Sequence, residues 1–380
     1  MHVASYAKDL ERWIPRLVSV WRKAQRRPGP AELTPAEVRD VGQGVKSLSL
    51  GLTRERELAG AKYMDDPRLL GAYLLFYWPV SYAQARQALG ELPRRHRAVL
   101  DLGSGPGPLA FAAMDAGGME VTAADRSRPA LELARELAIQ AEASLGTRHW
   151  DPLAKGDLPD GEFDLVSMGH ILNELYAKDP AADAQRARLC EDALRRVKPG
   201  GSLLLIEPAL RDTSRALLRV RDLLVARGYA VRAPCLWRGA CPALVKETDW
   251  CHGERDWQMP RLVEQLARAA GLHKEALKMS YLAVAPRGEA WPEPPSGRPF
   301  RIVSEPLEGK GRRRYIGCGP EGRLGLALQD KHVNPGNEAF GRLNRGDVIA
   351  ITETEPRGDG LALSDQSQVQ VVARAGQALP

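Results

Sequence analysis

The chain has 380 residues, of which 44% are hydrophobic and 27% charged, a balance that excludes wholesale disorder and suits two or three packed domains. Lys and Arg (54) exceed Asp and Glu (48), so a polyanionic partner depends on whether the basic residues cluster. The sequence has no run of about 18 apolar residues, and its charged N-terminal segment does not resemble a secretory signal. We therefore expect a cytoplasmic protein with no membrane partner.

The first part of the chain, residues 1–92, is expected to form a helical N-terminal domain. Residues 7–27 carry apolar side chains at the spacing of one helix face, and residues 67–89 form another long stretch of helical character. Between these two stretches, Thr34 followed by Glu37 predicts a capping box at the start of a further helix.

Predicted strands and helices alternate from residue 98 onward. The strands are expected at 98–102, 120–124, 163–168 and 202–207, and the helices at 108–116, 129–145 and 182–197. Strict alternation is typical of a parallel sheet with helices on both faces. We therefore predict an α/β fold with a Rossmann-like core over residues 93–290, which ends in a strand pair around 277–285.

The character of the chain changes after the core. A proline-rich stretch at 292–295 marks a linker. Over residues 298–365, short β-like runs alternate with turns that contain Gly and Pro, which predicts a small C-terminal β-domain that resembles a barrel. We expect the last residues, 366–380, to form a tail that frays.

The segment VLDLGSGPG, residues 99–107, joins a predicted buried strand to a helix. Its three glycines allow a tight turn and the close approach of a ligand to the backbone. Asp125, which ends the next strand, can accept hydrogen bonds from both ribose hydroxyls of a bound nucleoside. Dinucleotide dehydrogenases and ligand-free βα turns use similar glycines. The acidic Asp101 that opens this segment, however, is typical of class I methyltransferases that bind S-adenosylmethionine.

S-adenosylmethionine is therefore the expected cofactor, held by a class I methyltransferase core. Asp151 can receive the adenine amino group, although an ordinary loop aspartate is an alternative interpretation of this residue. The expected cofactor-binding residues are Asp101, Gly103, Ser104, Gly105, Gly107, Asp125, Asp151 and Gly169.

Four cysteines form a second candidate site. Cys235, Cys241 and Cys251 fall in one irregular segment, a cysteine-rich insertion at 233–257, and Cys318 lies in the predicted β-domain. In a reducing compartment, clustered thiols favour a metal over disulfides. Four thiolates suit zinc or an iron–sulfur cluster, and unrelated thiols are the third interpretation. The spacing differs from the paired CxxC of a zinc ribbon and suits a bulkier cluster.

Further motifs carry a resemblance to a known family. They lie at 48–56, 63–66, 72–74, 78–82, 171–175, 207–208, 233–235, 241–242 and 249–252. On these motifs, residues 45 to 350 resemble the bacterial and mitochondrial small-ribosomal-subunit methyltransferase-like family. The resemblance implies a [4Fe–4S] cluster held by Cys235, Cys241, Cys251 and Cys318, with zinc as the alternative. The chain departs from the family at Leu236-Trp237, where a His is usual, and at Ala209, where a Gly is usual.

The sequence leaves the reaction open. Residues 168–170 lack the Asn/Asp-Pro-Pro-aromatic signature that holds an amino group in many base N-methyltransferases. Asn173 and Glu174 are the candidate catalytic residues, as an acid–base pair. The alternative is that they cap a helix and face solvent.

Arginines gather at three places in the sequence. They are Arg94, Arg95 and Arg97, then Arg211, Arg215, Arg219 and Arg221, then Arg312, Arg313 and Arg314. Such clusters bind phosphate without reading base sequence. We expect the small ribosomal subunit and its rRNA as the partner, and no DNA. Two alternatives stay open, a non-catalytic RNA-binding assembly factor and a small-molecule methyltransferase with structural zinc.

Overall fold

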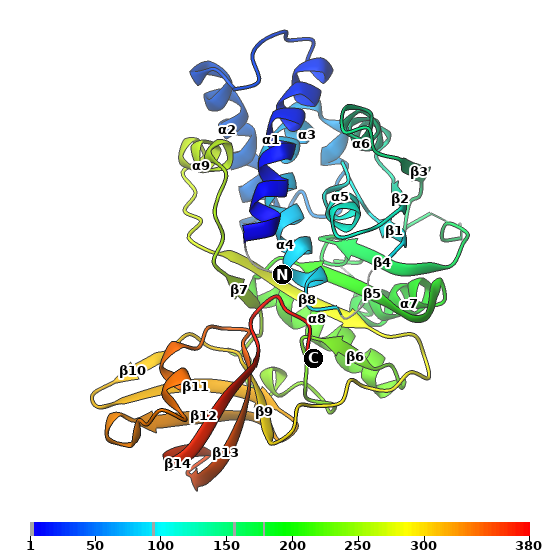
Figure 1. Ribbon diagram of the computed structural model, residues 1–380. Coiled ribbons are helices and arrows are strands. Elements are labelled where there is room, and N and C mark those ends of the chain that lie inside the picture. The colour runs from blue at the N-terminus through cyan, green and yellow to red at the C-terminus, as the bar shows by residue number, and fades with distance from the viewer. Residues whose placement is uncertain (1–3, 93–95, 155–156, 178) are drawn as a thin grey trace.

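The structure is a computed structural model that describes residues 4–92, 96–154, 157–177 and 179–380. Figure 1 shows a helical N-terminal region and a large sheet packed together, with a second and smaller sheet at the end opposite to helices α1 and α2. The predicted α/β fold, with a Rossmann-like core and a separate C-terminal β-sheet, is confirmed.

Helices of the N-terminal region pack directly on the core. They are α1 (Ala4–Ala24), α2 (Pro35–Ser49), α3 (Pro67–Ala72) and α4 (Trp78–Leu89). The predicted capping box starts α2, because the backbone N–H groups of Thr34 and Glu37 each donate to the other's side chain. The indole of Trp13 in α1 lies 4.8 Å from the Phe111 ring and donates to the Asp115 carboxylate at 2.7 Å. One continuous hydrophobic core therefore joins these helices to the sheet.

The helix predicted over 67–89 is interrupted. A π-helical turn at Tyr73–Tyr77 separates α3 from α4, and a second π-helical turn at Leu50–Arg54 follows α2. Pro79 has no N–H to donate to the carbonyl of Leu75, and its ring would collide with that carbonyl in a regular α-helix. The wider π turn avoids this collision, so the proline explains the first interruption.

The larger sheet has the doubly wound order β3-β2-β1-β4-β5, in which these five strands are parallel. Antiparallel β8 extends it, and β6 and β7 both pair with β8. The strands are β1 (Ala98–Leu102), β2 (Glu120–Asp125), β3 (Leu145–His149), β4 (Phe163–Gly169), β5 (Val197–Glu207), β6 (Val231–Ala233), β7 (Gly253–Arg255) and β8 (Leu277–Val284).

Helices cover both faces of this sheet (Figure 1). The helices α5 and α6 lie with the N-terminal helices on one face, and α7 and α8 lie on the other. Their bounds are α5 (Pro108–Asp115), α6 (Arg128–Gln140), α7 (Ala182–Leu194) and α8 (Arg211–Ala226), and α9 (Arg261–Ala269) packs beside α2. The β1–α5 turn therefore opens at the carboxyl edge of the sheet.

Two predictions about the core were wrong. The helix expected over 129–145 ends at Gln140, and Leu145 begins the edge strand β3. This strand, LGTRH, is partly or fully exposed along its length, so no buried face marks it in the sequence. The strand pair expected around 277–285 is the single strand β8, which borders other strands on both sides and is buried except at Lys278.

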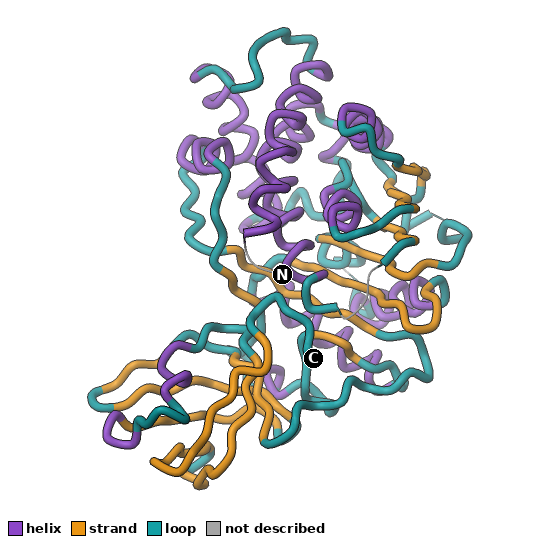
Figure 2. The backbone as a smooth tube through the Cα atoms, viewed as in Figure 1, coloured by secondary structure: helices purple, strands orange, loops and turns teal. Residues whose placement is uncertain are grey.

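The C-terminal sheet, whose strands are orange at the lower left of Figure 2, closes on itself through its strand pairing. Its strands are β9 (Arg298–Ile302), β10 (Leu307–Gly309), β11 (Arg312–Gly319), β12 (Gly322–Gln329), β13 (Val348–Arg357) and β14 (Gly360–Ala373). β9 pairs with both β13 and β11, which completes a ring around Phe300, Tyr315 and Phe340. β14 continues to Ala373, so the tail predicted from residue 366 begins inside a strand.

A buried cluster of charges lies where the β-domain meets the core. Glu91, which follows α4, accepts hydrogen bonds from Arg255 at 2.9 Å and from Tyr281 at 2.7 Å, and pairs with Arg301 of β9 at 3.1 Å. Burial opposes ionisation of Glu91, but the charges of Arg301 and Arg255 outweigh burial and hold its pKa below the usual range. This cluster therefore joins three separate parts of the chain.

Candidate functional site

The glycine turn is held open by hydrogen bonds to two buried carboxylates. Asp125 accepts the backbone N–H groups of Gly105 and Ser127, each at 2.7 Å. Asp101 accepts the N–H of Ala110 at 3.1 Å and the hydroxyl of Ser167 at 2.7 Å. Burial raises the pKa of Asp101 to about 7 and also raises the pKa of Asp125.

All three glycines of the turn have left-handed backbone, with φ of +67° at Gly103, +53° at Gly105 and +83° at Gly107. Residues with a Cβ rarely adopt this conformation. A Cβ at Gly103 would also stand 2.3 Å from the side chain of Ile171. The turn therefore requires glycine, as its sequence suggested.

A cavity of about 230 Å³ lies in front of this turn. Four of the predicted cofactor residues line it, Gly103, Asp125, Asp151 and Gly169. They stand at the carboxyl ends of β1, β2, β3 and β4, so the parallel sheet gathers them at one edge. Asp101, Ser104, Gly105 and Gly107 shape the turn behind the cavity.

A segment of the N-terminal region covers this cavity, which the sequence did not reveal. Arg126 donates to the carbonyls of Gly60 and Ala61 at 3.1 and 2.6 Å, and the Ser127 hydroxyl donates to Asp65 at 2.9 Å. Residues 60–65 all line the cavity. The helical region is thus part of the site, and the pairing of Arg126 with a distant loop is the contact that places it there.

Asn173 and Glu174 have different surroundings. The Oδ1 atom of Asn173 accepts from Arg56 at 2.8 Å, and its Nδ2 donates to the carbonyl of His170 at 2.9 Å. Its backbone N–H donates to Glu207 at 3.1 Å. Asn173 therefore holds the loop after β4 in place, and Glu174 is the better candidate for contact with a substrate.

Glu174 lies at the border of the cofactor cavity and a larger neighbouring cavity. Its carboxylate accepts from the hydroxyl of Tyr63 at 3.2 Å and from the N–H of Gly60 at 3.4 Å. Burial raises its pKa to about 7, against the opposing effect of these hydrogen bonds. A carboxylate with this pKa can both accept and release a proton near neutrality.

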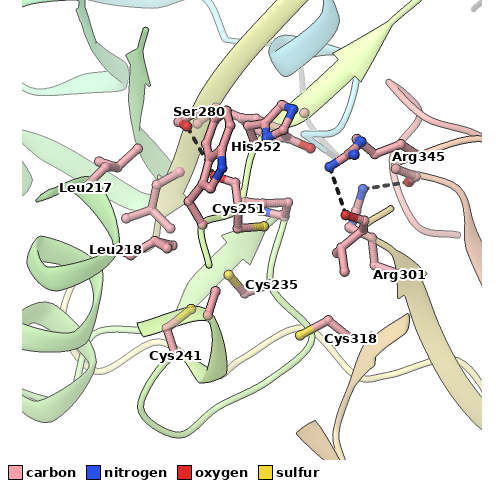
Figure 3. Close-up of a pocket in the computed structure, with 18 of the residues that line it drawn as sticks. Leu217, Leu218, Cys235, Cys241, Cys251, His252, Ser280, Arg301, Cys318 and Arg345 are labelled. Carbon is pink, nitrogen blue, oxygen red and sulfur yellow. Dashed lines mark hydrogen bonds between the residues drawn. The ribbon is translucent and has the colours of Figure 1, made fainter. Parts of the chain in front are cut away.

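All four predicted ligand cysteines line one small cavity, of about 70 Å³, between the core and the β-domain. Cys235 follows β6, Cys241 and Cys251 lie in the loop before β7, and Cys318 lies in β11. In Figure 3 the thiol groups point into a common space, with Cys318 approaching the other three from the β-domain. The first three are close in the sequence, and the fold brings the fourth to the same cavity.

Within the described residues, no group of three or more His, Cys, Asp or Glu side chains is arranged to hold a metal ion. The four thiol groups thus share a cavity without forming a ready-made ligand set. Burial raises the pKa of Cys241 to about 12 and that of Cys251 to about 11, so both are neutral thiols in this arrangement. Cys190 is separate from them, because it is buried in the core on α7.

The cavity wall carries several arginines, each of which also pairs with a carboxylate outside the cavity lining. Among the described residues, no carboxylate lines this cavity. The charged side chains that line it are Arg221, Arg255, Arg301, Arg323 and Arg345. Three of these arginines keep a buried Nε atom without a hydrogen-bond partner in the described structure, namely Arg221, Arg255 and Arg301. Buried donors normally have a partner. A cluster with sulfur ligands and negative charge fits this donor set.

The loop that carries Cys241 is anchored to α8. Asp222 accepts the backbone N–H of Cys241 at 3.0 and 2.9 Å, and the neighbouring Arg221 donates to the carbonyls of Trp237 and Gly239. Arg215 donates to the carbonyls of Ala243 and Lys246 at 3.1 and 2.8 Å. Two residues of the second arginine cluster therefore support the cysteine loop.

This corrects the interpretation of that cluster as one RNA-binding surface, because Arg221 is almost fully buried. Arg219 pairs with Asp183. Arg97, Arg312 and Arg314 are exposed and stay available to a polyanion. Arg94 and Arg95 lie outside the described residues.

Comparison with known proteins places the chain in a family. A sequence model of the family described as "Mitochondrial small ribosomal subunit Rsm22" matches residues 69–348, more than half of the chain. The chain belongs to the Rsm22 family. The Rsm22 match runs from α3 to the start of β13 and includes all four clustered cysteines. The resemblance to a small-subunit family is therefore confirmed.

Individual relatives match less of the chain than the Rsm22 model. The ubiquinone biosynthesis O-methyltransferase of Alkalilimnicola ehrlichii is 32% identical over 126 residues, which are 33% of this chain and 47% of that protein. The matched part thus spans about half the length of this curated relative.

Solved structures with a similar fold include a methyltransferase from Pyrococcus furiosus, with 14% identity and a TM-score of 0.36 over 54% of this chain and 83% of that chain. An S-adenosylmethionine-dependent methyltransferase from Mesorhizobium loti has 26% identity and a TM-score of 0.27 over 33% and 52%. Among the helices that the structure describes, none has the length and apolar character that a membrane crossing requires. The cytoplasmic location stays a prediction, since the description of the family is mitochondrial.

Proposed function

We propose that the protein binds S-adenosylmethionine and methylates the RNA of the small ribosomal subunit, and that its four clustered cysteines hold a [4Fe–4S] cluster. The observation that carries this proposal is the cavity at the carboxyl edge of the sheet, lined by Gly103, Asp125 and Gly169. In doubly wound sheets, ligands bind at this edge, where the strand order reverses between β1 and β4.

The residues of this cavity suit the parts of S-adenosylmethionine. Asp125 has further lone pairs for the ribose hydroxyls, and the left-handed glycine turn lets the methionine end approach the backbone. Asp151 lies at the end of β3, where it can accept from the adenine amino group. The bound cofactor would supply an electrophilic methyl group, and the protein's task is to orient the acceptor toward it.

The cluster assignment is supported by the shared cavity of the four thiols and by its arginine wall. The resemblance of the sequence motifs to this family implies iron rather than zinc, and His252, which also lines the cavity, offers zinc a nitrogen ligand. Three ligands come from the core and one from β11, so a bound group would tie the β-domain to the core. We assign the cluster this structural role and no step in the reaction.

Action on RNA is supported by the small-subunit description of the family and by the exposed residues Arg97, Arg312 and Arg314. A second candidate function is that of a non-catalytic assembly factor. The hydrogen bonds that occupy Asn173 favour it, because they leave Glu174 without the partner expected for an acid–base pair.

Methyl transfer to immature small subunits separates these functions. We expect purified protein to transfer a radiolabelled methyl group from S-adenosylmethionine to the rRNA, and the Asp125→Ala variant to lose this transfer. Cofactor binding without transfer supports the assembly factor. Absence of cofactor binding together with absence of co-sedimentation with small subunits contradicts both functions.

A further inference from the structure

A second cavity, of about 490 Å³, opens beside the cofactor cavity. Tyr63, Tyr73, His170 and Glu174 line both cavities, so a molecule in the larger one reaches the inner end of the smaller one. The larger cavity lies between the N-terminal helices, the loop after β5 and the loop before β8. Its volume is in the range of pockets that hold small ligands, about 300–1,000 Å³.

One wall of this cavity is built from tyrosines. The rings of Tyr73 and Tyr77 are stacked with centroids 5.7 Å apart and an angle of 24° between them, and Tyr63 lies 6.5 Å from Tyr73. Burial raises the pKa of Tyr77 to about 12, so its hydroxyl stays neutral and the wall stays uncharged. Flat aromatic faces favour a flat ligand, and stacking of one nucleobase contributes about 1–3 kcal/mol.

Four charged side chains line this cavity, Glu174, Lys274, Glu275 and Lys278, and Lys278 is paired with Glu254. Glu174 lies at the end shared with the cofactor cavity, where its carboxylate can accept an N–H from the ligand in addition to its bonds with Tyr63 and Gly60. Lys274 also lines the cavity, with its ammonium 5.7 Å from the centre of the Phe76 ring. Within the described residues, no carboxylate lies within ion-pair distance of Lys274, so the site offers a cation to an anionic part of the ligand.

Unusual backbone surrounds this cavity. Both π-helical turns contribute to its wall, Leu50–Arg54 and Tyr73–Tyr77. His170 and Arg56 both have left-handed backbone, with φ of +58° and +59°. Arg56 also holds Asn173 at the cavity wall through a hydrogen bond to its carbonyl. Such conformations cost free energy and recur at functional sites.

We infer that this cavity is the acceptor site and takes one unstacked nucleobase that carries an amino group. The inference rests on the proposed action on RNA. The tyrosine wall stacks on the base, Glu174 accepts the amino N–H, and Lys274 meets the phosphate of the same nucleotide. Enzymes that modify a base remove it from its stack, and a cavity of this size has room for one base.

Binding of short single-stranded RNA tests the inference. Fluorescence anisotropy would compare labelled ten-nucleotide strands of cytidine, adenosine and uridine, since uracil has no amino group. We expect the protein to bind the cytidine and adenosine strands at least about tenfold more tightly than the uridine strand, as one good polar contact gives. Glu174→Gln should weaken this preference, because its amide can donate to a carbonyl oxygen of uracil as well as accept from an amino group.

A blocking variant keeps the test independent of Glu174. Ala209 lines the larger cavity but not the cofactor cavity. The Ala209→Trp variant should therefore fill the larger cavity and weaken the binding of all three RNA strands, while S-adenosylmethionine still binds. Ile139→Trp, on the exposed side of α6, is the matched control and should leave both affinities unchanged.

Equal binding of the three strands by the wild type, or full binding by Ala209→Trp, would overturn the inference. Binding of a catechol to the cavity in place of RNA would also overturn the inference, since that result would assign the cavity to a small-molecule acceptor. If S-adenosylmethionine binding and co-sedimentation with small subunits persist in those cases, the proposed function stands and only the acceptor site fails.

Discussion

The glycine turn and the cysteine cavity are built in opposite ways. The turn consists of nearly consecutive residues, and two carboxylates fix it through short hydrogen bonds to nearby backbone. The cysteine cavity needs the irregular loop between β6 and β7 of the core and β11 of the β-domain to come together. The shape of the turn therefore depends on local geometry, whereas the cysteine cavity depends on long-range packing and, as proposed, on the group that it binds.

Among the substitutions that test this difference between the two sites, we expect loss of the fourth cysteine to have the largest effect. Cys318→Ser removes the proposed ligand that comes from the β-domain, so we expect the cluster to be lost and the β-domain to unfold at a lower temperature. Iron and sulfide assays with an absorption spectrum of anaerobically prepared protein measure the first effect, and a thermal scan the second. Cys190→Ser, a buried cysteine outside the cavity, is the control and should keep its iron. Equal iron in both variants would contradict the ligand assignment.

The buried charges beside the cavity provide the next test. Glu91→Ala leaves Arg255 and Arg301 without their shared carboxylate, and removal of one partner from a buried pair costs about 3–5 kcal/mol. The half-exposed pair of Arg27 and Asp40 is the control, where Asp40→Ala should cost about 1 kcal/mol or less. Urea unfolding measures both. Similar losses would mean that the junction does not depend on this cluster.

The sequence predicted the parts of the fold that depend on neighbouring residues. The capping box of Thr34 and Glu37, the glycine turn and the alternation of strands and helices all follow from short-range patterns. The edge strand β3 was missed, because its exposed residues carry no apolar alternation.

Long-range contacts explain the other differences. In the sequence, Arg215 and Arg221 look like members of a basic surface, but the structure turns them toward carbonyls of the cysteine loop. Spacing gave no sign that residues 60–65 cover the cofactor cavity, since only the fold brings Arg126 to them. Such roles depend on partners far away in the chain, which local periodicity does not contain.

At the glycine turn, we expect a smaller effect, which is measured as a loss of cofactor affinity. Asp125→Ala removes the proposed acceptor of the ribose hydroxyls, and hydrogen bonds to a charged group contribute about 1.5–3 kcal/mol, or about 10–100-fold in affinity. Isothermal titration with S-adenosylmethionine measures this change, and Asp125→Asn should lose less because it keeps one oxygen. Asp160→Ala, at an exposed carboxylate, is the control. An unchanged affinity would show that the ribose does not bind at the end of β2.

The smallest effect concerns pH and the buried Glu207, which holds the loop of Leu172 and Asn173. Burial raises its pKa to about 7, so between pH 4.5 and 7 the folded protein binds a proton that the unfolded chain releases. The stabilisation from Glu207 is complete below pH 4.5 and is lost as the pH rises to 7, with a slope of at most about 1.4 kcal/mol per pH unit.

Glu207→Gln lacks this titration. Its free energy of unfolding should therefore approach or exceed that of the wild type as the pH rises through this window, with exposed Glu120→Gln as the matched control. Urea unfolding at several pH values measures the difference between the two proteins. Parallel curves for Glu207→Gln and wild type would show that the carboxyl is already ionised at low pH, and the loop after β4 would then be held by a charge throughout.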